Sequence, residues 1–464
     1  MIINAKDTKF LSSCYAKRKK DVFLPVFHSE YSLKTVMKSL CRIILVLMLL
    51  IPVQLWSQIE HPIVGTTVSS SDKSFTITLV GKKQNYLPTE TLTQDRDIRS
   101  PKSVNIHPDG TKYYVNSLEG SKTVVYEMGS NTKLKVIMHE FTEADSLLWS
   151  EPSGLFPFTH YKTNLNTFKG KPVESAFSHD GRYLWVPYYR RSYDLNAQDP
   201  SAVAVIDTQT DSIVKLMETG PLPKMVAVSD DNCYVAITHW GNNTVGIINI
   251  DSDSPEDWYY EDCVTVQRKL NLNFSLTSSV NRDINSGLCL RGTAFTPDGR
   301  YLLVGCMAGK GGIAVIDLSD FSYLGNVYGM MSNLRHLVIR NGYIYLSINK
   351  EGYIQRIPLE QFYEAIDQLE NGTVTLKGWE NCKVAAGART IDITPDGRYV
   401  VAACNFGSRL VVVDTESFKE IARIKADSYP VGLDISKDGH YVYTTSQGRE
   451  GMGGNCVDIY RMDF

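Results

Sequence analysis

Hydrophobic and polar positions along this chain form a unit that recurs seven times. The clearest copy has a short apolar run at Thr293–Phe295, the turn Pro297-Asp298-Gly299 and a second apolar run at Tyr301–Val304. A glycine-rich loop and a β-branched run at Ile313–Ile316 follow. Short apolar runs bounded by Pro, Asp and Gly predict strands joined by tight turns. Recurrence of one such unit predicts a repeat architecture.

Every copy places a short strand before a polar turn and another strand after it. The turns are His107–Gly110, Ser178–Gly181, Ser229–Asn232, Pro297–Gly299, Asn341–Gly342, Pro395–Gly397 and Lys437–Gly439. A third strand is clear in several copies, as at Val203–Ile206 and Leu410–Val413, and a fourth is weaker, as at Ile421–Ile424. Seven units of four antiparallel strands predict an all-β fold, a seven-bladed β-propeller.

The last copy ends at Cys456–Met462, its third strand, and no residues follow that could form a fourth. Phe75–Val80 reads as a strand without a blade. Because an unpaired edge strand is a liability, we expect this N-terminal strand to complete the last blade. The predicted propeller covers residues 99–464, and residues 58–98 supply the closing strand.

Four insertions lengthen individual copies, at Glu140–Phe168, Arg190–Pro200, Ser252–Gly287 and Pro358–Lys383. Ser252–Gly287 is polar and opens with acidic residues, but it lacks the glycine and terminal glutamate of a calcium loop, so we expect a solvated loop. Leu359–Leu369 is the clearest amphipathic helix of the chain.

Residues 37–57 have the pattern of a secretory signal peptide. Lys38 and Arg42 precede the apolar run Ile43–Ile51, which is shorter than the roughly 20 residues of a membrane-spanning helix. A membrane anchor is the alternative. Residues 1–36 show no core pattern, and we expect translation to begin at Met37, so that this upstream extension is absent from the mature protein. The predicted localisation is exported, either periplasmic or on the cell surface, with no spanning segment after removal of the signal.

Charge and cysteine content narrow the possible partners. The first 57 residues hold 9 of the 48 basic and 3 of the 51 acidic residues, so residues 58–464 carry a net charge of −9. This acidic balance argues against nucleic acid as a partner. The seven cysteines after residue 57 are widely spaced, with neither a CxxC motif nor a metal-ligand spacing, and we predict no metal and no cofactor.

The repeats resemble those of the YVTN-repeat β-propellers, the YncE-like group of exported bacterial proteins. The matching segments are PDGRYLLVGC with IAVIDL, PDGRYVVAAC with LVVVDT, and HDGRYLWVPY with VAVIDT. The resemblance covers roughly Ser100 to Phe464; the fifth copy departs most, since Asn341-Gly342 replaces the PDG turn. It implies the propeller architecture and says little about chemistry, because one fold hosts many functions.

A basic residue opens the first strand in five of the seven copies: Lys102, Lys224, Arg291, Arg335 and Arg389, with Val173 and Val431 in the other two. First strands line the channel of a propeller, so we expect a ring of cations at one channel mouth that attracts an anionic ligand. Alternatively, these side chains pair with Glu174, Asp392 and Asp434 and hold the blades together. Loops after the second strands reach the same rim and add Tyr188, His239, Trp240, Asn349 and Asn405 as candidate ligand-binding residues.

Three functions fit this arrangement. The first is a non-enzymatic binding protein or interaction scaffold that recognises an anionic small molecule, a glycan or an envelope protein. The second is a lactonase-like or other propeller hydrolase, for which Glu174, His336 and His239 are the candidate catalytic groups, although they form no recognisable cluster. The third is a scaffold in a surface layer or envelope complex. The catalytic residues, if any, are unknown from the sequence.

Overall fold

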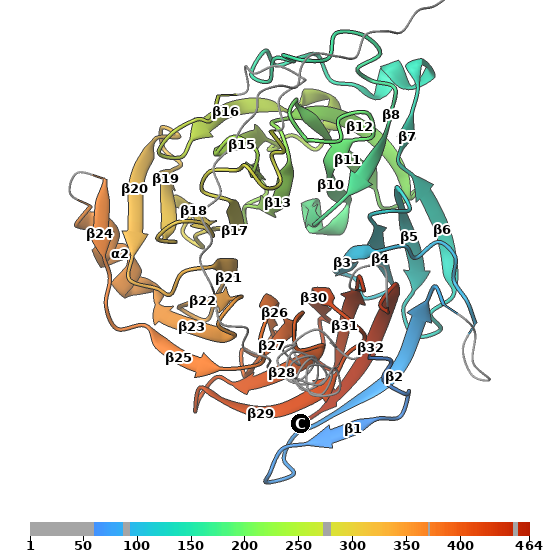
Figure 1. The fold of residues 1–464 in the computed structure, drawn as a ribbon, viewed down its shortest axis with the longest axis vertical. Helices are drawn as coiled ribbons and strands as arrows, with labels where there is room; N and C mark the ends of the chain where they lie inside the picture. The colour runs from blue at the N-terminus through green and yellow to red at the C-terminus, as the bar shows by residue number, and fades with distance from the viewer. Residues whose placement is uncertain (1–59, 87–92, 272–279, 370–371, 449–452) are drawn as a thin grey trace, which may run out of the picture. The chain divides into compact units, whose positions relative to one another are not determined.

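The computed structural model describes residues 60–86, 93–271, 280–369, 372–448 and 453–464. Seven β-sheets stand radially around a common centre and form a seven-bladed β-propeller (Figure 1). The predicted signal peptide at 37–57 and the upstream segment 1–36 lie outside the described residues. Among the described residues, no helix combines the length and the hydropathy needed to cross a bilayer.

Each blade is an antiparallel sheet whose first strand, here called the inner strand, faces the centre. Blade 1 holds β3 (Pro101–Ile106), β4 (Lys112–Ser117), β5 (Lys122–Glu127) and β6 (Lys133–Met138). Blade 2 holds β9 (Ala176–Ser178), β10 (Tyr183–Arg191), β11 (Ser201–Asp207) and β12 (Ser212–Thr219), with β7 (Glu140–Phe141) and β8 (Phe168–Pro172) added. Blade 3 holds β13 (Pro223–Val228), β14 (Tyr234–His239), β15 (Thr244–Asn249) and β16 (Tyr259–Thr265).

The remaining blades follow the same order. Blade 4 holds β17 (Leu290–Phe295), β18 (Tyr301–Cys306), β19 (Ile313–Asp317) and β20 (Tyr323–Tyr328), joined by β24 (Thr373–Thr375). Blade 5 holds β21 (Leu334–Arg340), β22 (Tyr343–Ile348), β23 (Tyr353–Pro358) and β25 (Glu380–Lys383). Blade 6 holds β26 (Ala388–Ile393), β27 (Tyr399–Cys404), β28 (Arg409–Asp414) and β29 (Lys419–Lys425). Blade 7 holds β30 (Pro430–Ile435), β31 (Tyr441–Ser446) and β32 (Cys456–Asp463).

The predicted closing strand is confirmed. Strand β2 (Thr76–Gln84) pairs antiparallel with β32 and becomes the fourth strand of blade 7, and β1 (Thr67–Ser69) extends that sheet. Phe75, Ile77 and Leu79 are fully buried against blades 6 and 7. The N-terminal and C-terminal segments therefore meet in one sheet, which closes the ring.

The tight turns form as the repeat predicts. In the fourth copy the Asp298 carboxylate accepts hydrogen bonds from the Thr296 hydroxyl (2.6 Å) and the Arg300 amide (3.2 Å), and Gly299 adopts φ +69°. The same arrangement recurs at Asp396, which accepts from Thr394 and Arg398. Each turn fixes the register between the first and second strands of its blade.

Two insertions contain more structure than the sequence indicates. The segment Ser252–Gly287, predicted as a solvated loop, supplies β16, the outer strand of blade 3. Most of the β16 side chains stay exposed or half-buried, so the strand has little hydrophobic signal and forms because β15 offers an unpaired edge. Pro358–Lys383 forms the expected helix, α2 (Leu359–Asp367), and then the outer strand β25.

Candidate functional site

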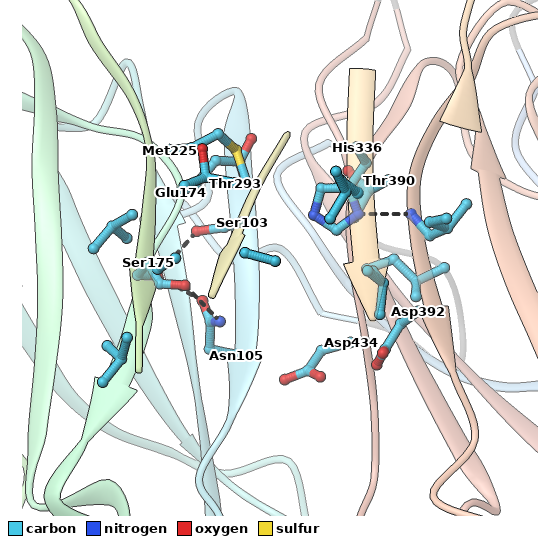
Figure 2. A pocket seen from close by; sticks show the side chains of 18 of the residues that line it. Ser103, Asn105, Glu174, Ser175, Met225, Thr293, His336, Thr390, Asp392 and Asp434 are labelled. Atoms are coloured by element: carbon cyan, nitrogen blue, oxygen red, sulfur yellow. Dashed lines mark hydrogen bonds between the residues drawn. The ribbon is translucent and has the colours of Figure 1, made fainter. Parts of the chain in front are cut away.

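A cavity of about 360 Å³ lies at the centre of the ring and is lined by the inner strands of all seven blades. Glu174, Met225, Thr293, His336 and Thr390 lie toward one end of the cavity, and Asp392 and Asp434 lie toward the other (Figure 2). Four of the five predicted cations, Lys224, Arg291, Arg335 and Arg389, stand one or two residues before a residue of the first group, and Lys102 directly precedes Ser103, which also lines the cavity. They therefore mark the mouth at that end, which we call the cationic mouth.

A β-bulge places these cations. Lys102 lies between the pairs Pro101↔Ser117 and Ser103↔Asn116 and has no partner on β4. Such an extra residue breaks the alternation of the strand and redirects a side chain. The same register shift occurs at the equivalent position of five other blades, at Lys224, Arg291–Gly292, Arg335, Arg389 and Val431. In blade 2, Val173–Ser175 instead lies between β8 and β9, which pair with β10 as two separate strands.

The backbone before the bulge is also unusual. In six blades, the residue two positions before the bulge residue has positive φ: Ser100, Leu222, Cys289, Asn333, Gly387 and Tyr429. Bulky residues such as Leu222 (φ 55°) and Tyr429 (φ 62°) adopt this conformation at a cost of about 1–3 kcal/mol each. The surrounding fold holds this strained rim in place, as is common at binding sites.

Two of the five cations have carboxylate partners at the mouth. An Nη atom of Arg291 lies 3.2 Å from Glu174, and the Lys224 ammonium lies 3.0 Å from Asp283. Of the three pairings that the sequence offered as an alternative, only the one with Glu174 forms. Within the described part of the chain, no carboxylate lies within ion-pairing distance of Lys102, Arg335 or Arg389.

The guanidinium groups also have unused donors. The Nε atoms of Arg291, Arg335 and Arg389 are buried and have no hydrogen-bond partner among the described residues. Arg291 and Arg389 are each only 3% exposed. One Nη of Arg335 meets only the soft sulfur of Met307, at 3.8 Å. Buried donors without acceptors are costly, so the mouth is arranged for an acceptor that the chain itself does not provide.

Burial and mutual repulsion lower the pKa values of these cations. Burial, and secondly the charge of Arg291, lower the pKa of Arg389 to about 10. Burial also lowers the pKa of Arg335, with the charges of Arg389 and Arg291 as the next causes. The pKa of Lys224 falls to about 7, chiefly through burial, although Asp283 opposes the shift. These shifts show that the cations face one another closely enough to interact.

His336 adds a neutral donor to the cationic mouth. Burial lowers its pKa to about 4, so the ring is uncharged at neutral pH. Its Nδ1 accepts a hydrogen bond from the Ile391 amide at 3.4 Å (Figure 2). The proton of the neutral ring then resides on Nε2, which makes that atom a donor.

The carboxylates at the other end of the cavity join blades. Asp392 of blade 6 accepts a hydrogen bond from the Ile435 amide of blade 7 at 3.2 Å. Asp434 of blade 7 accepts in the same way from Ile106 of blade 1, at 2.6 Å. Burial raises the pKa of Asp392 to about 6. The sequence-based pairing of these two aspartates with the ring cations is therefore wrong, because they lie at the opposite end and bind backbone amides.

The candidate residues predicted from the loops after the second strands occupy two different environments. Tyr188 is fully buried, and its hydroxyl bonds to His139 Nδ1 (2.9 Å). His239 is also fully buried, with one ring nitrogen bonded to the Gly220 amide and the other to the Thr244 hydroxyl. Burial lowers the pKa of His239 to about 3. Both side chains lie outside the lining of the central cavity, and their described contacts are within the core.

The other members lie nearer the cationic mouth. Trp240 forms part of an aromatic wall for Lys224, whose ammonium stands 5.1 Å from its ring and 4.1 Å from that of Tyr189. Asn349 and Asn405 contact each other between blades 5 and 6 (3.4 Å), and the Asn405 Nδ2 atom is buried without a partner among the described residues.

Two residues at the cationic mouth, Asp283 and Tyr429, were not predicted as site residues from the sequence. Asp283 comes from the long polar segment before β17, and Tyr429 precedes the inner strand of blade 7. Tyr429 lies close enough to Arg335 and Arg389 to interact electrostatically with both. Neither residue belongs to the repeated pattern, so no signal in the sequence marks them.

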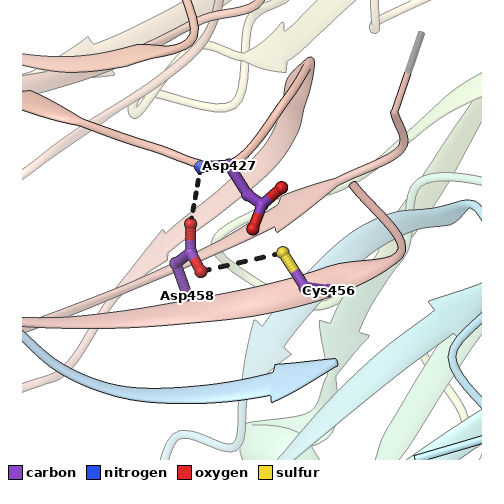
Figure 3. Close-up of side chains that lie close together, drawn as sticks. All are labelled: Asp427, Cys456 and Asp458. Atoms are coloured by element: carbon purple, nitrogen blue, oxygen red, sulfur yellow. Dashed lines mark hydrogen bonds between the residues drawn. The ribbon is translucent and has the colours of Figure 1, made fainter. Parts of the chain in front are cut away.

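A second cluster of charged groups lies where the ring closes. Asp427, Cys456 and Asp458 approach one another in blade 7 (Figure 3). Three such ligands can in principle hold a metal ion, but the Lys82 ammonium of β2 lies 2.8 Å from Asp427 and 3.2 Å from Asp458. The lysine supplies the positive charge that a metal would otherwise bring, so this cluster is a closure lock rather than a metal site.

The comparison with solved structures supports the propeller fold. No family model matches the sequence, and no curated protein matches it significantly. A solved structure, described as Kuenenia stuttgartiensis hydrazine synthase, is similar with a TM-score of 0.55 and 14% identity, covering 81% of this chain and 99% of that chain. At this identity the likeness extends to the fold alone. The chain is a seven-bladed β-propeller.

Proposed function

We propose that this propeller binds a small anionic molecule at the cationic mouth. The observation that carries the proposal is the pair Arg335 and Arg389, held on the neighbouring inner strands β21 and β26 without a carboxylate partner among the described residues. Two like charges kept together out of water cost free energy, and an anion bound between them would offset that cost.

The dimensions of the site support a small ligand. The central cavity is lined by residues one or two positions after the five cations rather than by the cations themselves, and its volume of about 360 Å³ falls at the lower end of the range for small-molecule sites, roughly 300–1,000 Å³. Guanidinium groups bind carboxylate and phosphate through two parallel hydrogen bonds. The hydroxyl groups of Ser103, Thr293 and Thr390 lie in the lining just below the mouth. They donate to the backbone carbonyls of Val173, Arg291 and Val431, so their oxygen lone pairs remain to accept a hydrogen bond from a ligand hydroxyl. Sugar acids, sugar phosphates and short carboxylic acids are therefore the classes to test first.

Calorimetry with glucuronate, glucose 6-phosphate and lactate tests the proposal on the wild type and on an Arg335→Gln/Arg389→Gln variant. We expect at least one anion to bind, with an affinity about 100-fold lower in the variant, because one desolvated charged contact is worth about 2–5 kcal/mol. Arg423→Gln is the matched control, since Arg423 is exposed on the outer strand β29 and pairs with Glu420. Equal binding by the wild type and the double variant would contradict the proposal.

We also propose that the chain is a divergent member of the YVTN-repeat group and that it is exported. The PDG-type turns followed by a tyrosine-led strand support the first statement, and the basic and apolar pattern of residues 37–57 supports the second. Expression of the full chain in a bacterium, followed by fractionation and N-terminal sequencing, tests export. Recovery of uncleaved protein from the cytoplasm would contradict it.

A further inference from the structure

Lys102 differs from the other basic residues of the cationic mouth. Its side chain is buried, with the residue only 8% exposed, and its amine faces Arg389, Arg291, Arg335 and Glu174. No hydrogen bond or ion pair to this amine exists among the described residues. The other lysine of the mouth, Lys224, is fully engaged by Asp283 at 3.0 Å and by the rings of Tyr189 and Trp240.

The surroundings of Lys102 disfavour its charged form. Burial is the largest cause of a pKa well below the ordinary value, and the positive charges of Arg389, Arg291 and Arg335 act in the same direction, whereas the charge of Glu174 opposes it. An amine that loses its proton below the usual range has a free lone pair at a pH where an exposed lysine is an ammonium ion. Desolvation and neighbouring cations are the conditions under which lysines become nucleophiles.

We propose that Lys102 captures the carbonyl group of a small carbonyl-bearing carboxylate, such as a 2-oxo acid, as a reversible imine. This inference rests on the proposed anion site, because Arg335 and Arg389 would hold the carboxylate while the adjacent carbonyl carbon meets the Lys102 amine. A carboxylate and a carbonyl on neighbouring atoms match a guanidinium pair and an amine that share one mouth.

The step balances without a further reagent. The lone pair of the Lys102 nitrogen attacks the carbonyl carbon, a C–N bond forms and the C=O bond becomes a hydroxyl group as a proton moves from nitrogen to oxygen. The hydroxyl then leaves as water with the remaining amine proton, and a C=N bond forms. No atom is oxidised or reduced, and water entering from the open mouth reverses the reaction.

Reductive trapping tests the inference on the full chain. The protein is incubated with pyruvate and sodium cyanoborohydride, which delivers hydride to the imine carbon and fixes the adduct as a secondary amine. Mass spectrometry of the intact protein and of its peptides then locates the adduct. We expect one 1-carboxyethyl group on Lys102, and loss of that group in Lys102→Met and in the presence of excess lactate, which has the carboxylate but no carbonyl.

Two controls separate a directed reaction from general lysine chemistry. Lys169→Met removes an exposed lysine of β8 and should leave the adduct on Lys102 in place. Propanal, a carbonyl compound without a carboxylate, should label Lys102 far less than pyruvate does. Labelling spread over exposed lysines, or equal labelling by propanal, would overturn the inference.

The anion site and the imine can fail separately. Calorimetry with lactate on Lys102→Met measures anion binding without the amine. If lactate binds and pyruvate leaves no adduct in the wild type, the imine is refuted and the anion site stands. If neither lactate nor pyruvate binds and no adduct forms, both are refuted.

Discussion

Two buried lysines of this propeller have opposite surroundings. Lys82 of β2 lies in the closure lock, bonded to Asp427 and within 3.2 Å of Asp458. Nearby carboxylates raise its pKa above the ordinary value although burial opposes them. Lys102 of β3 lies among three arginines, and burial and repulsion lower its pKa. The same residue type is therefore held charged in one place and driven toward the neutral form in the other.

The contrast separates a structural charge from a functional one. At the closure lock, cation and carboxylates satisfy each other, and Asp427 accepts further bonds from Tyr86 (3.1 Å) and the Gly454 amide (3.0 Å). At the cationic mouth, like charges remain without partners. A fold that is under no functional demand would not keep such a cluster, because buried unpaired charges reduce stability. The seam of the ring holds buried ion pairs, and its centre holds the groups that we propose as the binding site.

The largest expected effect comes from removing each lysine in turn. Lys82→Met leaves two buried carboxylates without their cation, so we expect the free energy of unfolding to fall by about 3–5 kcal/mol. Lys102→Met removes a buried amine that has no partner among the described residues, and we expect a change of less than about 1 kcal/mol or a gain in stability. Denaturant unfolding monitored by circular dichroism measures both. A larger loss in Lys102→Met than in Lys82→Met would invert the comparison.

The pH dependence of stability sharpens the comparison between the cationic mouth and the closure lock. In the unfolded chain a lysine has a pKa of about 10.4, whereas the folded-state pKa of Lys224 is about 7, first because it is buried and then because Arg291 and Arg335 repel its charge. Between these values the unfolded chain binds more protons, so this lysine makes stability rise with pH by about 1.4 kcal/mol per pH unit.

Lys224→Met removes that contribution. We expect the stability of the variant relative to the wild type to decline by this slope as pH rises from about 7 to 10. Unfolding curves at several pH values measure the slope, and Lys169→Met controls for the substitution itself. A difference that stays constant with pH would show that Lys224 is protonated in the folded state throughout this range.

The smallest effect concerns the carboxylate that already occupies the mouth. Glu174 faces Arg291, Arg335 and Arg389 and opposes an incoming anion. Glu174→Gln should tighten lactate binding by about tenfold, the size expected for removing one like charge at about 8–10 Å in a partly solvated site. Calorimetry measures this, with Glu420→Gln on the outer strand as the control. Unchanged or weaker binding would show that Glu174 supports the ligand rather than repels it.

Much of the fold was predictable because its causes are local. The Asp298 turn forms through hydrogen bonds within five residues. In Phe75–Val80, apolar and polar side chains alternate, and a strand buries every second one. The basic positions at Lys102, Lys224, Arg291, Arg335 and Arg389 were visible as well, since they recur at one place in the repeat. The outer strand β16 was not visible, because its side chains are mostly solvated and its only cause is the free edge of β15.

The amino-acid sequence alone determined the number of blades, the closing strand and the places of the five cations, because turn chemistry and strand patterning act over a few residues. The tertiary structure decided which cations have partners. A bulge in the inner strand of each of the five blades that supply the cations directs these side chains to one mouth, while Asp392 and Asp434 lie at the other end and Asp283 arrives from a distant loop. The charge of Lys102 depends on groups from four other blades, since burial and Coulomb interactions follow distance in space.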